Sequence, residues 1–228
     1  ISDVMMPEMN GYELCTAIKS DINLCHIPII FLTAKNDIDS KVKGLKVGAE
    51  AYIEKPFSYD YLKAQILSLL NNRQKEREAF SKRPFFPVQN MQMSKEDEVF
   101  MNKVIEVINA NMEDETFNVE RMAEALCLSR SSLLRKIKTL FNMSPIDFIR
   151  LIRLKKAAEL IQDGKYRVGE ISYMVGFGSH SYFSKLFFKQ FGMTPKDFEQ
   201  QIASTRSKVR NAQEINIEDL IQNNRANS

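Results

Sequence analysis

Tryptophan is absent from the 228-residue chain, and cysteine is scarce. Cys15, Cys25 and Cys127 are an odd number with no CxxC spacing, which argues against a disulfide framework or a zinc site and fits a reducing compartment. No apolar run approaches the roughly 18 residues of a membrane-spanning helix, and a run such as Ile27–Leu32 has the length of a strand. We therefore expect small buried cysteines and no membrane contact by this segment.

Charge is distributed unevenly along the chain. The net charge of +3 conceals a block at residues 121–197 with 14 basic and 6 acidic residues, a net charge of +8, whereas residues 1–80 carry a net charge of −1. A basic block of this kind favours an anionic partner, with nucleic acid as the first candidate. The alternative on charge alone is a solvated, lysine-rich helical surface.

The first part of the chain alternates strand and helix patterns. The apolar spacing predicts strands at Ile1–Met5, Ile27–Thr33 and Ala51–Glu54, and helices at Gly11–Ser20, Asp39–Val47 and Asp60–Glu78. Such alternation is typical of parallel strands joined by crossover helices. Residues 1–80 therefore read as an α/β domain with a parallel sheet.

The rest of the chain is helical in pattern. Residues 81–95 contain two prolines and no clear period, so we interpret them as a linker in which Phe85 and Phe86 dock onto a neighbouring surface. Residues 96–203 follow a helical period, and residues 204–228 form a polar tail that we expect to be disordered apart from a weak turn around Ile215–Ile221. The predicted helices are Glu96–Asn111, Val119–Leu126, Ser129–Phe141, Pro145–Gln162, Val168–Val175, Ser179–Phe191 and Pro195–Ile202.

An internal repeat with an offset of 50 residues occurs at 119–145 and 168–195. Each copy has a short helix, a tight turn and a longer helix that begins at a serine, Ser129 or Ser179, as in a helix-turn-helix. The period turns Leu133, Ile137, Phe141, Phe183, Phe187 and Phe191 inward. It leaves Arg130, Ser131, Arg135, His180, Ser181, Ser184 and Lys185 outward or lateral, where cations, hydroxyls and an imidazole suit base and phosphate edges.

The helix Pro145–Gln162 joins the two copies. At 1.5 Å per residue it spans about 27 Å, which would hold the two reading helices about one DNA turn, ~34 Å, apart. The alternative is a plain helical bundle that binds protein.

The stretch from Lys156 to Pro195, with its Gly176-Phe-Gly-Ser-His-Ser-Tyr-Phe-Ser-Lys-Leu-Phe-Phe-Lys segment, resembles the DNA-binding domain of the AraC/XylS transcription factors. The resemblance covers about 105 residues, from roughly Asp97 to Gln201. It implies two helix-turn-helix units in which Ser131, Arg135, His180, Ser181, Ser184 and Lys185 face bases. Glu199 departs from the basic residue usual in the family.

Three polar residues lie at the ends of the predicted parallel strands: Asp3, Thr33 and Lys55. The carboxyl ends of such strands meet at one edge, where open α/β sheets place their sites. A carboxylate that attacks phosphorus, with a hydroxyl and an ammonium that stabilise phosphoryl oxygens, could form an acyl-phosphate site. For Asp3 or Thr33 taken alone, an ordinary capping role at the strand end is the alternative.

This spacing, with Asp-x-x-Met-Pro-x-Met-x-Gly at residues 3–11 and Lys-Pro-Phe at 55–57, resembles a response-regulator receiver domain. The resemblance implies a flavodoxin-like fold with Asp3 as the phosphoacceptor, Thr33 as the switch hydroxyl, Lys55 as the phosphate-binding ammonium and Tyr52 as the rotating aromatic. It also implies Mg²⁺ on Asp3 and the Met5 backbone carbonyl, and a cis Lys55–Pro56 peptide.

The two further acids of the family's magnesium site would precede Ile1, as would two strands and two helices. We expect a receiver domain that lacks its N-terminal half, at the C-terminal end of a hybrid two-component sensor or of a stand-alone regulator. A hybrid version would carry a histidine kinase upstream and be anchored in the inner membrane.

The sequence therefore predicts a cytoplasmic bacterial transcription regulator controlled by aspartyl phosphorylation, and not an enzyme. The expected partners are double-stranded DNA, a histidine kinase or kinase domain as phosphodonor, and a second copy in a homodimer. One alternative is a DNA-binding fragment with no phosphate input. The other is an aspartyl-nucleophile phosphatase, which commonly needs an acid two residues after the nucleophile, where this chain has Met5.

Overall fold

The computed structural model describes residues 1–21, 24–34, 42, 44 and 46–207. The chain forms two compact units. The first unit contains residues 1–111 and 116–152, and the second contains residues 112–115 and those from 153 onward. The boundaries predicted from the sequence, 1–80, 81–95, 96–203 and 204–228, stay predictions. Within the described ranges, no helix combines the length and the apolar character needed to cross a bilayer.

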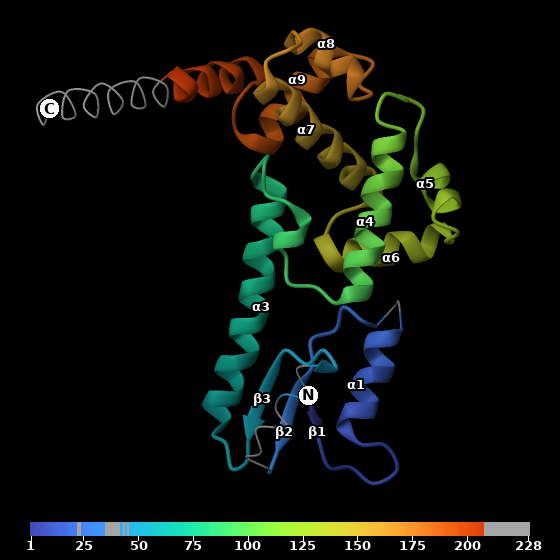
Figure 1. The fold of residues 1–228 in the computed structure, drawn as a ribbon, viewed down its shortest axis with the longest axis vertical. Helices are drawn as coiled ribbons and strands as arrows, with labels where there is room; N and C mark the ends of the chain where they lie inside the picture. The colour runs from blue at the N-terminus through green and yellow to red at the C-terminus, as the bar shows by residue number, and fades with distance from the viewer. Residues whose placement is uncertain (22–23, 35–41, 43, 45, 208–228) are drawn as a thin grey trace, which may run out of the picture. The chain divides into compact units, whose positions relative to one another are not determined.

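A small parallel sheet organises the start of the first unit (Figure 1). Its order is β1-β2-β3, with β1 at Ser2–Asp3, β2 at Ile30–Thr33 and β3 at Ala51–Glu54. The helices α1 (Gly11–Ser20) and α3 (Tyr59–Lys82) flank it. The core contains Val4, Cys15, Ile29, Phe31 and Ala49. These features confirm the predicted α/β class and agree with a partial receiver fold.

The strand β2 begins at Ile30, so the prediction that it begins at Ile27 is wrong. A turn precedes the strand, because the Ile27 backbone N–H donates to the Leu24 carbonyl at 2.9 Å. Pro28 has no N–H to offer a ladder, and the Ile29 N–H donates to the Glu50 carboxylate at 2.6 Å. The apolar run is therefore part turn and part strand.

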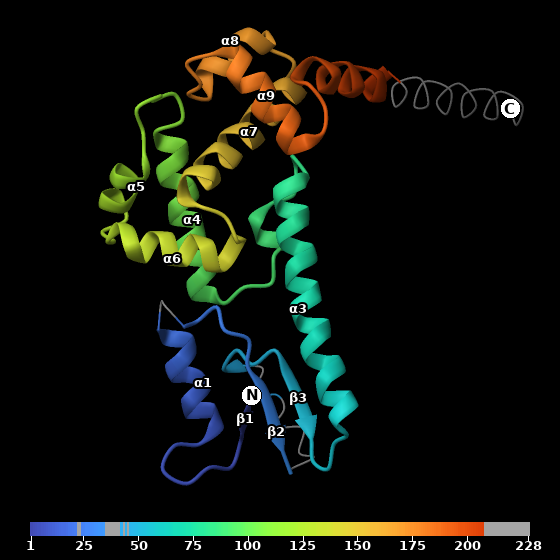
Figure 2. The ribbon, with the colours of Figure 1, turned by 180° about the vertical axis from the view of Figure 1, so that it is seen from behind.

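The helix α3 is longer than predicted at both ends. It begins after Ser58, whose hydroxyl accepts a hydrogen bond from the Tyr61 N–H, and continues to Lys82. Figure 2 shows it as one uninterrupted helix. Phe80 lies beyond the predicted end at Glu78, among charged residues. It is nevertheless only 2% exposed and belongs to the core of the unit. The helix predicted at Asp39–Val47 falls largely on residues that the structure does not describe.

The connection after α3 contains the 3₁₀ turn η1 (Val88–Asn90). Val88 and Met91 are its buried apolar residues, whereas Phe85 is 45% exposed. The Gln92 N–H donates to the Glu76 carboxylate of α3 at 2.9 Å. The predicted linker thus docks through Val88 and Met91, and the docking of Phe85 and Phe86 stays a prediction.

The remaining helices match their predicted positions within one or two residues. They are α4 (Lys95–Ala110), α5 (Val119–Ala125), α6 (Arg130–Phe141), α7 (Pro145–Asp163), α8 (Val168–Met174) and α9 (His180–Phe191). A further helix covers residues 195–207, so the first four residues of the predicted tail are helical. The tail beyond residue 207, with the predicted turn at Ile215–Ile221, is outside the described part of the chain.

The repeat has a physical counterpart at the helix ends. Ser129 caps α6 and Ser179 caps α9, each accepting a hydrogen bond from the backbone N–H three residues on. Both helices end at a residue in the left-handed region, Asn142 at φ 55° and Gly192 at φ 78°, 50 residues apart. Asn and Gly are the residues that take this conformation most readily. The sequence repeat is therefore a repeat of helix start and stop signals.

Candidate phosphate site and nucleic-acid interface

Asp3 and Lys55 meet at the carboxyl edge of the sheet. The Lys55 ammonium donates a hydrogen bond to the Asp3 carboxylate and forms an ion pair with it. The backbone N–H of Lys55 donates to the Thr33 carbonyl at 2.8 Å, so all three predicted residues lie on adjacent strand ends. The hydrogen bond from Lys55, with a second one from the Met5 N–H at 3.1 Å, holds the pKa of Asp3 below its usual range.

Thr33 and Tyr52 line one pocket beside this edge. The pocket is also lined by Glu54, Pro56, Phe57, Ser58 and Tyr61. Thr33 is buried, and the Tyr52 ring stands edge-on to Phe31 with centroids 5.2 Å apart. Burial raises the pKa of Tyr52, and a hydrogen bond with Tyr12 raises it further. Lys55–Pro56 is cis, as predicted.

Magnesium is the cofactor that a receiver resemblance implies. Among the described residues, there is no group of three or more His, Cys, Asp or Glu side chains that could hold a metal ion. Asp3 is engaged by Lys55 and by the Met5 N–H. One carboxylate and the Met5 carbonyl are a small part of the oxygen shell that Mg²⁺ requires. These residues alone do not make the site.

The helix α6 separates its two faces as predicted. Leu133, Ile137 and Phe141 are buried in the first unit. Arg130, Ser131 and Arg135 are exposed. Arg130 forms an ion pair with Glu120 at 2.8 Å, and the Ser131 hydroxyl lies 3.0 Å from that of Ser129. The exposed face thus offers cations and hydroxyls at the N-terminal half of the helix.

The helix α9 in the second unit has the same division. Phe183 and Phe187 are fully buried, and Phe191 packs against the same core while partly exposed. The outward residues His180, Ser181 and Lys185 are exposed, and Ser184 is half-buried. The assignment of individual base contacts, and the spacing of α6 and α9 along DNA, stay predictions.

Three cations of the basic block are buried, which the sequence did not reveal. Lys136 is 5% exposed, Arg153 6% and Lys155 8%. Lys136 Nζ lies 2.5 Å from Asp97 Oδ1, and Arg153 donates to two backbone carbonyls. Burial lowers the pKa of Lys155 to about 8 against the opposing effect of Glu159. The charge available to a partner is therefore smaller than the block's count. The sequence gives only a weak signal of this burial, namely that each of these cations lies next to apolar helix positions.

Two family models match the chain. A response regulator receiver domain matches residues 1–67, and a helix-turn-helix domain matches residues 122–201. Both describe regulatory rather than catalytic domains, as the sequence predicts.

The relatives found by comparison are regulators and a kinase. Histidine kinase P4 of Formosa agariphila is 40% identical over 201 residues, which are 88% of this chain and 15% of the kinase. The transcriptional regulatory protein GltR of Pseudomonas aeruginosa is 46% identical over 74 residues, 32% of this chain and 31% of that protein. The matched part of the chain thus covers well under half the length of these relatives. Among solved structures, the C-terminal domain of AraT, a response regulator from Geobacillus stearothermophilus, is 29% identical with a TM-score of 0.41, covering 45% of this chain and 84% of that one.

Proposed function

The chain joins a response regulator receiver domain to an AraC-type helix-turn-helix domain, and from that premise we propose that it is a sequence-specific transcription regulator controlled by aspartyl phosphorylation. Its partners are double-stranded DNA, a histidine kinase or kinase domain as phosphodonor, and a second copy of the chain. We place its action in the bacterial cytoplasm.

The observation that carries the proposal is the pair of serine-capped helices with exposed polar faces. On α6 the face carries Arg130, Ser131 and Arg135, and on α9 it carries His180 and Lys185. The N-terminal half of such a helix is the part that reaches base edges in a helix-turn-helix. We assign Arg135 and Lys185 to base edges or phosphates, and the hydroxyls of Ser131, Ser181 and Ser184 to base edges.

The input in this proposal is a phosphoryl group on Asp3. A carboxylate oxygen of Asp3 attacks phosphorus, an O–P bond forms, and the P–N bond to the donor histidine breaks with its electron pair left on the imidazole nitrogen. Lys55, already paired with Asp3, neutralises the phosphoryl oxygens, and Thr33 donates a hydrogen bond to one of them. Tyr52 follows Thr33, with which it lines one pocket. The proposal includes Mg²⁺ only for a chain that also carries the further acidic ligands implied by the receiver resemblance.

DNA binding by charge-removed variants tests the output. The probe is a duplex that the wild-type chain selects from a random library. Arg135→Ala and Lys185→Ala should each weaken binding about tenfold or more, since a good base contact contributes about 1–3 kcal/mol. Each lost phosphate contact should also reduce the slope of log affinity against log salt by about 1. Titrations by fluorescence anisotropy at several salt concentrations measure both quantities.

Matched controls separate a specific contact from a general loss of charge. Lys103→Ala removes an exposed cation of α4, and Lys165→Ala removes one that follows α7. Both should leave affinity within about twofold, because neither lies on α6 or α9 and isolated, screened surface charges contribute little. If Arg135→Ala and Lys185→Ala behave like these controls, the assignment of α6 and α9 as reading helices is wrong.

The remaining alternative is a DNA-binding fragment with no phosphate input. Acetyl phosphate labelling distinguishes it, on a polypeptide that also carries the two acids that the receiver resemblance predicts. We expect one phosphoryl group per chain, detected by intact mass, and its loss in Asp3→Asn. Labelling that persists in Asp3→Asn, or that never appears, favours the alternative.

A further inference from the structure

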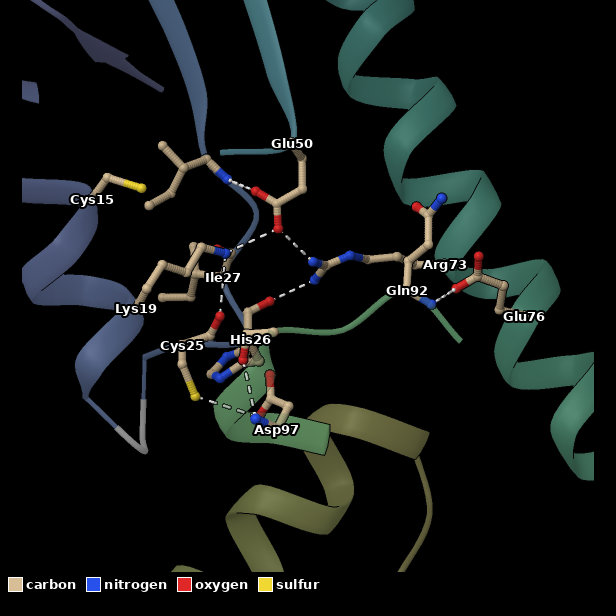
Figure 3. Close-up of polar contacts among 12 residues, drawn as sticks. Cys15, Lys19, Cys25, His26, Ile27, Glu50, Arg73, Glu76, Gln92 and Asp97 are labelled. Carbon is tan, nitrogen blue, oxygen red and sulfur yellow. Dashed lines mark hydrogen bonds and ion pairs between the residues drawn. The ribbon is translucent and has the colours of Figure 1, made fainter. Parts of the chain in front are cut away.

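A loop of the receiver part, residues 24–27, is fixed from several sides (Figure 3). The Lys19 ammonium of α1 donates to the carbonyls of Cys25 at 3.3 Å and Ile27 at 2.9 Å. The Arg73 guanidinium of α3 donates to the His26 carbonyl at 2.5 Å. Both cations also reach the Glu50 carboxylate, at 3.0 and 2.9 Å. The loop is therefore held firmly to the sheet, to α1 and to α3.

The same loop contacts the helices of the first helix-turn-helix. The Cys25 thiol donates to Asp97 Oδ1 of α4 at 3.4 Å. Lys136 Nζ of α6 lies 3.0 Å from Cys25 Sγ and pairs with the same Asp97 oxygen. All three residues are buried. One buried side chain from each of three segments, the loop, α4 and α6, thus meets in a single cluster.

The C-terminal end of α6 is held by α3. The Arg77 guanidinium donates to the Leu140 carbonyl at 2.9 Å through Nε and to the Thr139 carbonyl at 2.8 Å through Nη2. These carbonyls belong to the last turn of α6, where a cation is favoured by the helix dipole. Burial lowers the pKa of Arg77, and the neighbouring Arg73 charge lowers it further. Phe80, one turn on, packs against Phe141 with ring centroids 4.9 Å apart.

These contacts leave the outward face of α6 open, since Arg130, Ser131 and Arg135 remain exposed. The helix α3 begins at Tyr59, four residues after Lys55 of the phosphate edge and directly after its cap Ser58, and runs without a break to Arg77. At 1.5 Å per residue, the stretch from its start to Arg77 covers about 27 Å. One rigid helix therefore links the end of the phosphate site to the end of the reading helix.

We infer that the receiver part is the docking surface for the first reading helix, and that Arg77 is a positioning residue for DNA contact by α6. This inference rests on the proposed function for its consequence, because only a DNA-reading role makes the placement of α6 matter. Its structural half does not depend on that role. Arg77 touches no DNA in this scheme and acts through the C-terminal turn of α6 and the cluster behind it.

Two cysteines provide the test. Cys15 and Cys25 are both fully buried, but Cys15 lies in the receiver core and Cys25 at the docking surface. Opening of the docking surface alone would expose Cys25, whereas global unfolding would expose both. In the full chain, the alkylation rate of each cysteine by iodoacetamide is measured by peptide mass spectrometry, for the wild type, Arg77→Gln, Arg77→Lys and the control Lys75→Gln, which removes an exposed cation of α3.

We expect Arg77→Gln to speed Cys25 alkylation about tenfold with Cys15 unchanged, since hydrogen bonds from a charged group are lost. Arg77→Lys keeps the charge but loses one of the two donor groups that reach the α6 carbonyls. The Cys25 alkylation rate should therefore lie between those of the wild type and Arg77→Gln. Lys75→Gln should match the wild type. Unchanged Cys25 reactivity in Arg77→Gln, or an equal rise at Cys15 and Cys25, would overturn the inference.

DNA binding separates this inference from the proposed function. If the docking surface positions α6, Arg77→Gln should weaken binding to the selected duplex while Lys75→Gln does not. If Arg135→Ala and Lys185→Ala leave binding unchanged, the proposed function fails, and selective exposure of Cys25 would still support the docking. If Arg77→Gln selectively exposes Cys25 to alkylation but leaves DNA affinity at the wild-type value, the positioning role of Arg77 is overturned.

Discussion

Lys136→Met is expected to lower the free energy of unfolding of the first unit by about 3–5 kcal/mol, the usual cost of removing one partner from a buried ion pair. Lys136 and Asp97 are 5% and 1% exposed, and their charged atoms are 2.5 Å apart. Methionine fills a similar volume but leaves the Asp97 carboxylate without its cation. Among the residues that the structure describes, the second oxygen of Asp97 has no hydrogen-bond partner, so the Cys25 thiol at 3.4 Å is poor compensation.

Urea unfolding, with hydrogen exchange on peptides of α4 and α6, measures this effect. Lys138→Met, an exposed cation on the same helix, is the matched control and should change stability by less than about 0.5 kcal/mol. The double variant Lys136→Met with Asp97→Leu should recover most of the loss, since an apolar pair of similar volume often replaces a buried ion pair without cost. A loss below about 1 kcal/mol for Lys136→Met would show that the pair contributes little.

Periodicity and spacing were sufficient for the regular parts of the fold. The repeat placed Ser129 and Ser179 at helix starts, and the 3.6-residue period identified Leu133, Ile137, Phe183 and Phe187 as core. These signals are local, because a cap or an apolar stripe acts within one helix. The sequence could also predict that Asp3, Thr33 and Lys55 lie close together, because the carboxyl ends of parallel strands meet at one edge of the sheet.

The contacts that hold α6 and the turn before α9 were not predictable from one sequence. Lys136, Arg153 and Arg77 look like surface cations, and charge counting treated them as such. Lys136 and Arg153 are buried and Arg77 is half-buried, and each contacts a group distant in sequence: Asp97 for Lys136, the Gly176 carbonyl for Arg153 and the Leu140 carbonyl for Arg77. Such pairing is a property of tertiary packing, which a local period does not contain. The late start of β2 at Ile30 also follows from tertiary packing, because the Ile29 N–H donates its hydrogen bond to the Glu50 carboxylate.

The turn before α9 depends on Arg153 in the same way. Arg153 of α7 donates to the Gly176 carbonyl at 3.0 Å and to the Asp114 carbonyl at 2.6 Å, and it joins two loops of the second unit. Burial lowers the pKa of Arg153, which Asp114 and Glu115 partly oppose. Gly176 has a φ of 72°, and an added Cβ would lie 2.5 Å from the Met112 carbonyl oxygen and 2.7 Å from Arg153 Cζ. The turn is therefore built around the guanidinium.

Arg153→Met should consequently destabilise the second unit by about 2–6 kcal/mol, because two carbonyls lose their donor at about 1–3 kcal/mol each. Hydrogen exchange in α8 and α9 should rise, and DNA binding through α9 should fall with it. Lys156→Met, which breaks an exposed pair with Glu159 on the same helix, should cost less than about 0.5 kcal/mol. Arg153→Lys keeps a cation but not the fork that spans two loops, so it should rescue only part of the loss. Full rescue by lysine would mean that charge alone, and not the bridge between Gly176 and Asp114, fixes the turn.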